Sequence, residues 1–140
     1  MAHSHTTILV AEDEPRICEL MVATLKAEGY NVLHASNGPD AIEIARRLAA
    51  DIHLLVTDFK MPTMNGDELA DRLLDTRPYI KVLFASGTLD SDSLPILRGA
   101  TCVAHLAKPY TPRQLVDEVR IVLDSTERAV IKNRLVRSVR

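Results

Sequence analysis

His53–Gly66 reads HLLVTDFKMPTMNG, a short apolar run followed by one aspartate, a Met-Pro step and an Asn-Gly pair. A short run rich in Leu and Val is typical of a strand that is covered on both faces of a sheet. Asp58 comes directly after this run, where such a strand meets its connecting loop. We therefore interpret the stretch as one buried strand, an acidic loop and the start of a helix.

The same pattern recurs on both sides of this stretch. Strands are predicted at Thr6–Ala11, Asn31–Ala35, His53–Thr57, Ile80–Ala85 and Cys102–Leu106. Apolar residues at helical spacing predict helices at Pro15–Glu28, Asp40–Ala49, Asn65–Thr76, Asp90–Arg98 and Pro112–Leu123. This alternation reads (βα)₅, which indicates an α/β fold with a parallel sheet and helices on both faces.

Local signals add detail to three of the helices. The first carries an apolar stripe that includes Ile17 and Leu20, and it is expected to end at Gly29. A turn at residues 37–39, Asn-Gly-Pro, is expected before the second. The last is expected to begin with Thr111 as its N-cap.

Composition excludes several classes of protein. The chain has 140 residues, 46% hydrophobic and 26% charged, as expected for one folded domain. No apolar run approaches the roughly 20 residues that span a bilayer, and the first five residues do not resemble a signal peptide. Cys18 and Cys102 form no CxxC motif. These features favour a cytoplasmic protein with no membrane span.

The net charge of −2 is divided unevenly along the chain. Residues 1–124 sum to −6, from 12 Lys and Arg against 18 Asp and Glu, whereas residues 125–140 sum to +4. We therefore divide the chain into a domain at 1–124 and a basic amphipathic C-terminal helical extension or tail at 125–140. The tail is expected to contact a protein, a second copy of the chain included. DNA binding is not expected, because the tail has few basic residues and no base-reading fold.

Chemistry-bearing residues follow four of the five predicted strands. The carboxyl ends of parallel strands meet at one edge of a sheet, so side chains that follow them can share a pocket. The residues in question are Glu12, Asp13 and Glu14, then Asp58, then Ser86, Gly87 and Thr88, and finally Lys108 and Pro109. Taken singly, each is explained as a turn, a helix cap or a loop exit. Their joint occurrence favours one shared site.

Several carboxylates in one cleft must become protonated, move apart or share a cation. Two like charges about 4 Å apart repel by roughly 4 kcal/mol at an effective dielectric constant near 20. Oxygen ligands favour Mg²⁺, which leaves coordination positions for phosphate and water. A carboxylate can attack phosphorus, and Lys108 and Ser86 would then hold phosphoryl oxygens. The residues therefore predict a Mg²⁺-dependent phosphoryl acceptor.

From Thr6 to about Leu123 the chain resembles the response-regulator receiver family of two-component signalling. The resemblance lies in four segments, Ile8–Glu14, Val56–Gly66 with its D-x-x-M-P-x-M-x-G string, Leu83–Gly87 and Leu106–Tyr110. It implies a flavodoxin-like three-layer sandwich whose five-stranded parallel sheet has the order 2-1-3-4-5.

The resemblance implies a role for each acidic residue of the site. Asp58 would be the phospho-acceptor, and its donor would be a phosphohistidine on a sensor histidine kinase or a histidine phosphotransfer protein. Glu12, Asp13 and Asp58 would hold Mg²⁺ together with the backbone carbonyl of Lys60. Output would pass through contacts with a downstream protein that the sequence does not identify.

The resemblance also implies roles at the two later strand ends. Ser86 would be the switch hydroxyl, and Lys108 would be the matching ammonium, with a cis bond to Pro109. His105 departs from the family, which usually has Tyr or Phe three residues before the lysine. His105 either replaces that aromatic switch or is a half-buried strand histidine. Tyr110 occupies a different position.

Three other functions fit parts of the sequence. A hydrolase with an aspartyl-phosphate intermediate usually needs a second Asp where Lys60 stands. A flavodoxin-like electron carrier would need a phosphate-binding loop where this chain has acids. A degenerate receiver that acts without phosphorylation is disfavoured by the presence of Asp58 and Lys108. The expected function is therefore a signalling switch and not an enzyme.

Overall fold

The computed structural model describes residues 3–87, 102–125 and 129–131, in which strands and helices alternate. The strands are β1 (Thr7–Ala11), β2 (Asn31–Ala35), β3 (Leu54–Thr57), β4 (Lys81–Ser86), β5 (Cys102–Ala107) and β6 (Ala129–Ile131). The helices are α1 (Pro15–Ala27), α2 (Gly38–Arg47), α3 (Gly66–Thr76) and α4 (Pro112–Asp124). The helix expected at residues 90–98 and Thr88 lie outside the described residues. None of the described helices has the length and apolar character needed to cross a membrane.

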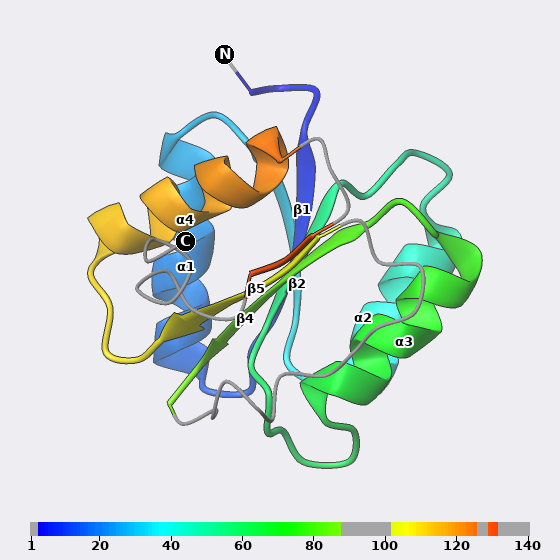
Figure 1. The fold of residues 1–140 in the computed structure, drawn as a ribbon. Coiled ribbons are helices and arrows are strands. Elements are labelled where there is room, and N and C mark those ends of the chain that lie inside the picture. The colour runs from blue at the N-terminus through cyan, green and yellow to red at the C-terminus, as the bar shows by residue number, and fades with distance from the viewer. Residues whose placement is uncertain (1–2, 88–101, 126–128, 132–140) are drawn as a thin grey trace.

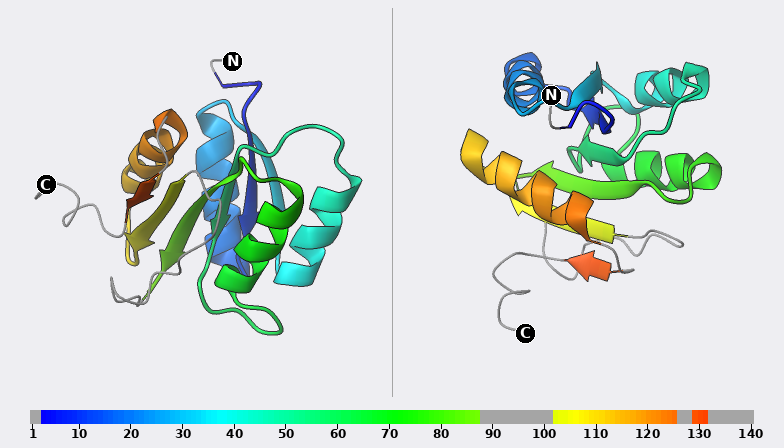
Figure 2. Two further views of the ribbon diagram at one scale, coloured as in Figure 1. Left: turned by 45° about the vertical axis from the view of Figure 1, so that its right-hand side comes forward. Right: turned by 90° about the horizontal axis from the view of Figure 1, so that it is seen from above.

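The strands form one parallel sheet in the order β2-β1-β3-β4-β5-β6. Its first five strands have the predicted order 2-1-3-4-5. Helices α1 and α4 cover one face of the sheet, and α2 and α3 cover the other (Figures 1 and 2). The predicted three-layer α/β sandwich is confirmed.

Apolar side chains fill both sides of the sheet. In β1, Leu9 and Ala11 belong to the core under α2 and α3, whereas Ile8 and Val10 belong to the core under α1 and α4. All four are fully buried. A strand that is covered on both faces needs apolar residues at every position, which is why continuous apolar runs predicted these strands.

Helix α2 begins earlier than predicted. Asn37 is its N-cap, and the Oδ1 atom of Asn37 accepts a hydrogen bond of 2.8 Å from the Asp40 backbone. Gly38 and the following proline are therefore helical and do not form a separate turn, since proline fits the first turn of a helix. A Cβ atom on Gly38 would lie only 2.7 Å from the Met64 sulfur. A larger residue at position 38 would therefore force Met64 to shift.

The predicted end of α1 at Gly29 and the predicted start of α4 at Thr111 are confirmed. Gly29 follows α1 with φ of 98°, in the left-handed region that glycine adopts without strain. Thr111 forms a capping box with Gln114 at the start of α4, in which each side chain accepts a hydrogen bond from the other residue's backbone.

The sequence predicts a helical extension or a tail at 125–140, and the described residues of that segment, 125 and 129–131, are extended. Helix α4 ends at Asp124, Ser125 is extended, and β6 pairs with β5. The Lys81 Nζ atom donates hydrogen bonds of 2.7 and 2.6 Å to the Leu123 and Ser125 carbonyls, which accounts for the end of α4. The backbone N–H and C=O groups along the outer edge of β5 then pair with the backbone of β6. Residues 132–140 lie outside the described residues.

Candidate functional site

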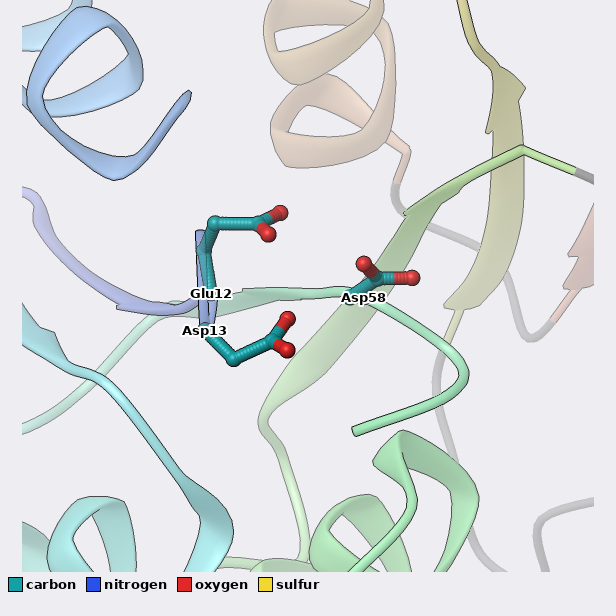
Figure 3. Close-up of side chains that lie close together, drawn as sticks. All are labelled: Glu12, Asp13 and Asp58. Carbon is teal, nitrogen blue, oxygen red and sulfur yellow. The ribbon is translucent and has the colours of Figure 1, made fainter. Parts of the chain in front are cut away.

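Three carboxylates lie together at the carboxyl ends of β1 and β3 (Figure 3). Glu12 and Asp13 follow β1, and Asp58 follows β3. The two strands are neighbours, and the Asp58 backbone donates to the Ala11 carbonyl over 3.1 Å. One oxygen from each carboxylate lies within 4.8 Å of the others. The sheet thus brings together the three acids that the sequence singled out.

Lys108 reaches this cluster from the end of β5. Its Nζ atom lies 3.2 Å from an Asp58 oxygen and 3.3 Å from a Glu12 oxygen. Burial alone would lower the pKa of Lys108, but the Glu12 and Asp58 carboxylates outweigh burial and raise that pKa. The expected cis bond between Lys108 and Pro109 is present. Lys108 is therefore held as a cation beside Asp58.

Glu12 is the most buried acid of the cluster, with 1% of its surface exposed. Its pKa is raised, chiefly by burial and further by Asp58, although a hydrogen bond from the Glu14 backbone and the charge of Lys108 act in the opposite direction. In the described part of the site one ammonium faces three carboxylates, so negative charge is in excess. Oxygen donors with excess negative charge fit a hard divalent cation such as Mg²⁺.

The loop between β3 and α3 folds back tightly against Asp58. The Gly66 backbone donates to the Phe59 carbonyl over 2.7 Å, and the Met61 backbone donates to the Asn65 side chain over 3.3 Å. A Cβ atom on Gly66 would overlap the Asp58 carbonyl oxygen. Only glycine therefore fits at this point of the D-x-x-M-P-x-M-x-G string.

Thr63 has φ of 75° in the same loop, a conformation that is unfavourable for a β-branched residue. We expect Thr63→Asn to raise the free energy of unfolding by about 1 kcal/mol, because asparagine tolerates the left-handed region better. Urea unfolding measures this change. Thr63→Val keeps the branched side chain and is expected to give no gain. An equal gain in both variants would show that backbone conformation is not the cause.

Ser86 and His105 contact each other on neighbouring strands. Ser86 is the last residue of β4, and its Oγ atom lies 3.4 Å from the Nε2 atom of His105 in β5. His105 is 5% exposed, so it is more buried than expected. Burial lowers its pKa, while hydrogen bonding with the Ser86 backbone acts in the opposite direction. Tyr110 packs on the other face of the sheet, in the core under α1 and α4.

An apolar groove that the sequence did not reveal lies beside the site. It has a volume of about 480 Å³ and is lined by Ile17, Leu20, Met21, Thr24, Lys108, Pro109, Tyr110, Pro112 and Leu115. Leu20 is 53% exposed, although its helical stripe suggested a core position. The Tyr110 hydroxyl is buried without a hydrogen-bond partner among the described residues. Burial, together with Glu12 and Asp58, raises the pKa of Tyr110 to about 12.

Two known proteins of one organism resemble this chain in sequence. The response regulator receiver protein CpdR of Brucella abortus is 35% identical over 116 residues, which cover 83% of this chain and 95% of CpdR. The sensor kinase CckA of the same organism is 32% identical over 121 residues, which cover 86% of this chain but 13% of the kinase. The chain also spans about half the length of one longer response regulator and of two transcriptional regulatory proteins that it matches.

Solved structures agree with this likeness. The receiver domain of the hybrid histidine kinase CckA has a TM-score of 0.71 at 30% identity and covers 84% of this chain and 99% of that one. The response regulator TrrA of Thermotoga maritima, solved in complex with Mg(2+)-BeF, has a TM-score of 0.70 at 26% identity and covers 84% and 98% of the two chains.

The family model of the response regulator receiver domain matches residues 8–120. This match spans the described strands and helices of the sandwich. It leaves out β6, the first residue of β1 and the last turn of α4. The chain therefore belongs to the family of response regulator receiver domains, the signalling switches of two-component systems.

Proposed function

We propose that this chain is a phosphoryl-accepting switch in which Asp58 receives its phosphoryl group from a phosphohistidine. The proposal is carried by one observation: the Asp58 carboxylate shares a sheet edge with two further acids and lies 3.2 Å from Lys108. In the transfer, the phosphorus–nitrogen bond of the donor breaks while an Asp58 oxygen bonds to phosphorus, and the leaving imidazole nitrogen takes up a proton from solvent water.

Each neighbour of Asp58 has a part in this proposal. Lys108 would pair with a phosphoryl oxygen in place of the Asp58 oxygen that it now contacts. The Ser86 hydroxyl would donate a hydrogen bond to another phosphoryl oxygen. Glu12, Asp13, Asp58 and the Lys60 carbonyl would hold Mg²⁺. The ion would offset the excess negative charge and polarise the phosphoryl oxygens.

Intact mass after incubation with acetyl phosphate and Mg²⁺ tests the proposed chemistry. We expect the gain of one phosphoryl group, and we expect that gain to be lost when EDTA removes the metal. A chain that stays unmodified with acetyl phosphate and also with a phosphorylated histidine phosphotransfer protein would contradict the proposal. A receiver that acts without phosphorylation would then explain the site better.

The apolar groove beside Lys108 is proposed to receive a helix of the phosphohistidine donor. A donor imidazole must come within bonding distance of Asp58, and Lys108 both contacts Asp58 and lines the groove. The exposed Leu20 would bury its side chain in that contact, since apolar area removed from water stabilises a complex.

Leu20→Glu is therefore expected to slow phosphorylation by a protein donor at least about tenfold, because a carboxylate would be buried against an apolar partner. Phosphorylation by acetyl phosphate is expected to stay unchanged, since this small donor needs no docking surface. Tyr79→Glu is the matched control, because Tyr79 is 83% exposed and precedes β4. It therefore lies at the amino end of that strand, whereas the site lies at the carboxyl ends of the strands. Equal slowing with both donors would show that Leu20 acts on the site itself.

The proposed output is contact with a downstream protein. We take residues 1–124 as the receiver unit, in keeping with the end of α4 at Asp124. The basic residues after it are a candidate contact for that protein or for a second copy of the chain. Action as a switch and not as an enzyme, and a cytoplasmic location, belong to the same proposal.

A further inference from the structure

The contact between Ser86 and His105 joins a buried hydroxyl to a buried imidazole. In the register of β4 and β5, Phe84 lies opposite His105 and Ser86 lies opposite Ala107. Ser86 and Phe84 are two residues apart on one strand, so Ser86 and His105 share a face of the sheet. Their side chains are 3% and 5% exposed, and the two polar atoms are 3.4 Å apart. Water therefore has little access to compete for this hydrogen bond.

The hydroxyl of Ser86 has a single hydrogen to donate. A neutral imidazole has one ring nitrogen that accepts and one that donates, and burial favours the neutral ring. Phosphoryl oxygens only accept, so a serine that binds a phosphoryl group must donate its hydrogen to that group. In the tautomer that carries its hydrogen on Nδ1, the Nε2 atom of His105 accepts the hydrogen bond from Ser86, and Nε2 and a phosphoryl oxygen on Asp58 would then compete for the same hydrogen atom.

We propose that His105 is a positioning residue that holds the Ser86 hydroxyl in the unphosphorylated chain and must release it before Ser86 can bind the phosphoryl group. The inference rests on the proposed function and adds a regulatory step to it. In this step the strength of one hydrogen bond between β4 and β5 sets how readily the phosphorylated arrangement forms. A phenylalanine at the same position has no such bond, so the histidine makes this receiver harder to switch on.

His105→Phe is expected to strengthen binding of beryllium fluoride, a phosphoryl mimic, in the presence of Mg²⁺. One buried hydrogen bond corresponds to roughly a two- to tenfold change in the binding constant. A titration followed by ¹⁹F NMR measures this constant without any donor protein. His105→Gln offers an acceptor and a donor in a similar place and is expected to bind the mimic as the unmodified chain does. Urea unfolding checks that each variant is folded.

A double-mutant cycle separates this role from simple packing. Ser86→Ala removes the hydroxyl, so His105→Phe is expected to have no effect on binding in that background. An equal effect with and without the hydroxyl would overturn the proposal, because His105 would then act without Ser86. Unchanged or weaker binding by His105→Phe alone would also overturn it and leave the proposed function standing. Failure of the unmodified chain to bind the mimic would overturn both.

Discussion

Asp58→Asn is expected to stay at its unmodified mass after incubation with acetyl phosphate and Mg²⁺, under conditions in which the unmodified chain gains one phosphoryl group. An amide lacks the negative oxygen that attacks phosphorus. The substitution also removes the carboxylate oxygen that lies 3.2 Å from the Lys108 Nζ atom and one acid of the proposed metal site. The expected effect is complete loss, because no other group in the proposal can replace the nucleophile.

Asp51→Asn is the matched control for this experiment. Asp51 is an exposed aspartate that precedes β3, so it lies at the other end of the strand that Asp58 follows. Its variant is expected to accept the phosphoryl group as the unmodified chain does. Phosphorylation of Asp58→Asn would show that the nucleophile lies elsewhere, and peptide mapping would then distinguish Glu12 from Asp13.

Gly66→Ala is expected to lower the free energy of unfolding by about 2–3 kcal/mol, the range of a poorly accommodated buried group. The added methyl group would overlap the Asp58 carbonyl oxygen and would also lie 3.1 Å from a Thr57 side-chain carbon. Both neighbours belong to the junction between β3 and its loop, so the backbone that carries Asp58 must shift. Urea unfolding measures the stability, and the same variant should accept a phosphoryl group more slowly.

Gly87→Ala provides the control for Gly66→Ala. Among the described residues, and apart from its own chain neighbours, no atom would lie within 4 Å of a Cβ atom on Gly87. Its effect on the free energy of unfolding is expected to stay within about 0.5 kcal/mol, as for most substitutions at open positions. If the two alanine variants were equally stable, the loop after Asp58 would not be packed as tightly as these contacts indicate.

Much of the architecture was predictable because it depends on residues that are close together in the chain. Apolar runs predicted β1 to β5, since a strand with two covered faces has no polar side in its pattern. The caps at Gly29 and Thr111 are equally local signals. The closeness of Glu12, Asp13 and Asp58 was predictable because these residues follow parallel strands, whose carboxyl ends meet at one edge of the sheet.

Other features depend on contacts between distant segments and were not predictable. Met64 packs against Gly38 from a distant segment, and α4 ends where Lys81 binds the carbonyls of Leu123 and Ser125. Leu20 fits an apolar helical stripe, yet the neighbouring elements leave half of its surface exposed. An apolar stripe in the sequence shows which side of a helix is apolar. It does not show how much of that side the neighbouring elements cover.

The sequence by itself determined the strands, their parallel arrangement and the acidic edge, because periodicity and order along the chain are enough to specify them. Only the tertiary structure decided which side chains touch there. Lys108 lies 50 positions from Asp58 and 96 from Glu12, and His105 lies 19 from Ser86. Distances of a few ångströms between such residues are set by strand register and by packing on both faces of the sheet, and no local pattern encodes these.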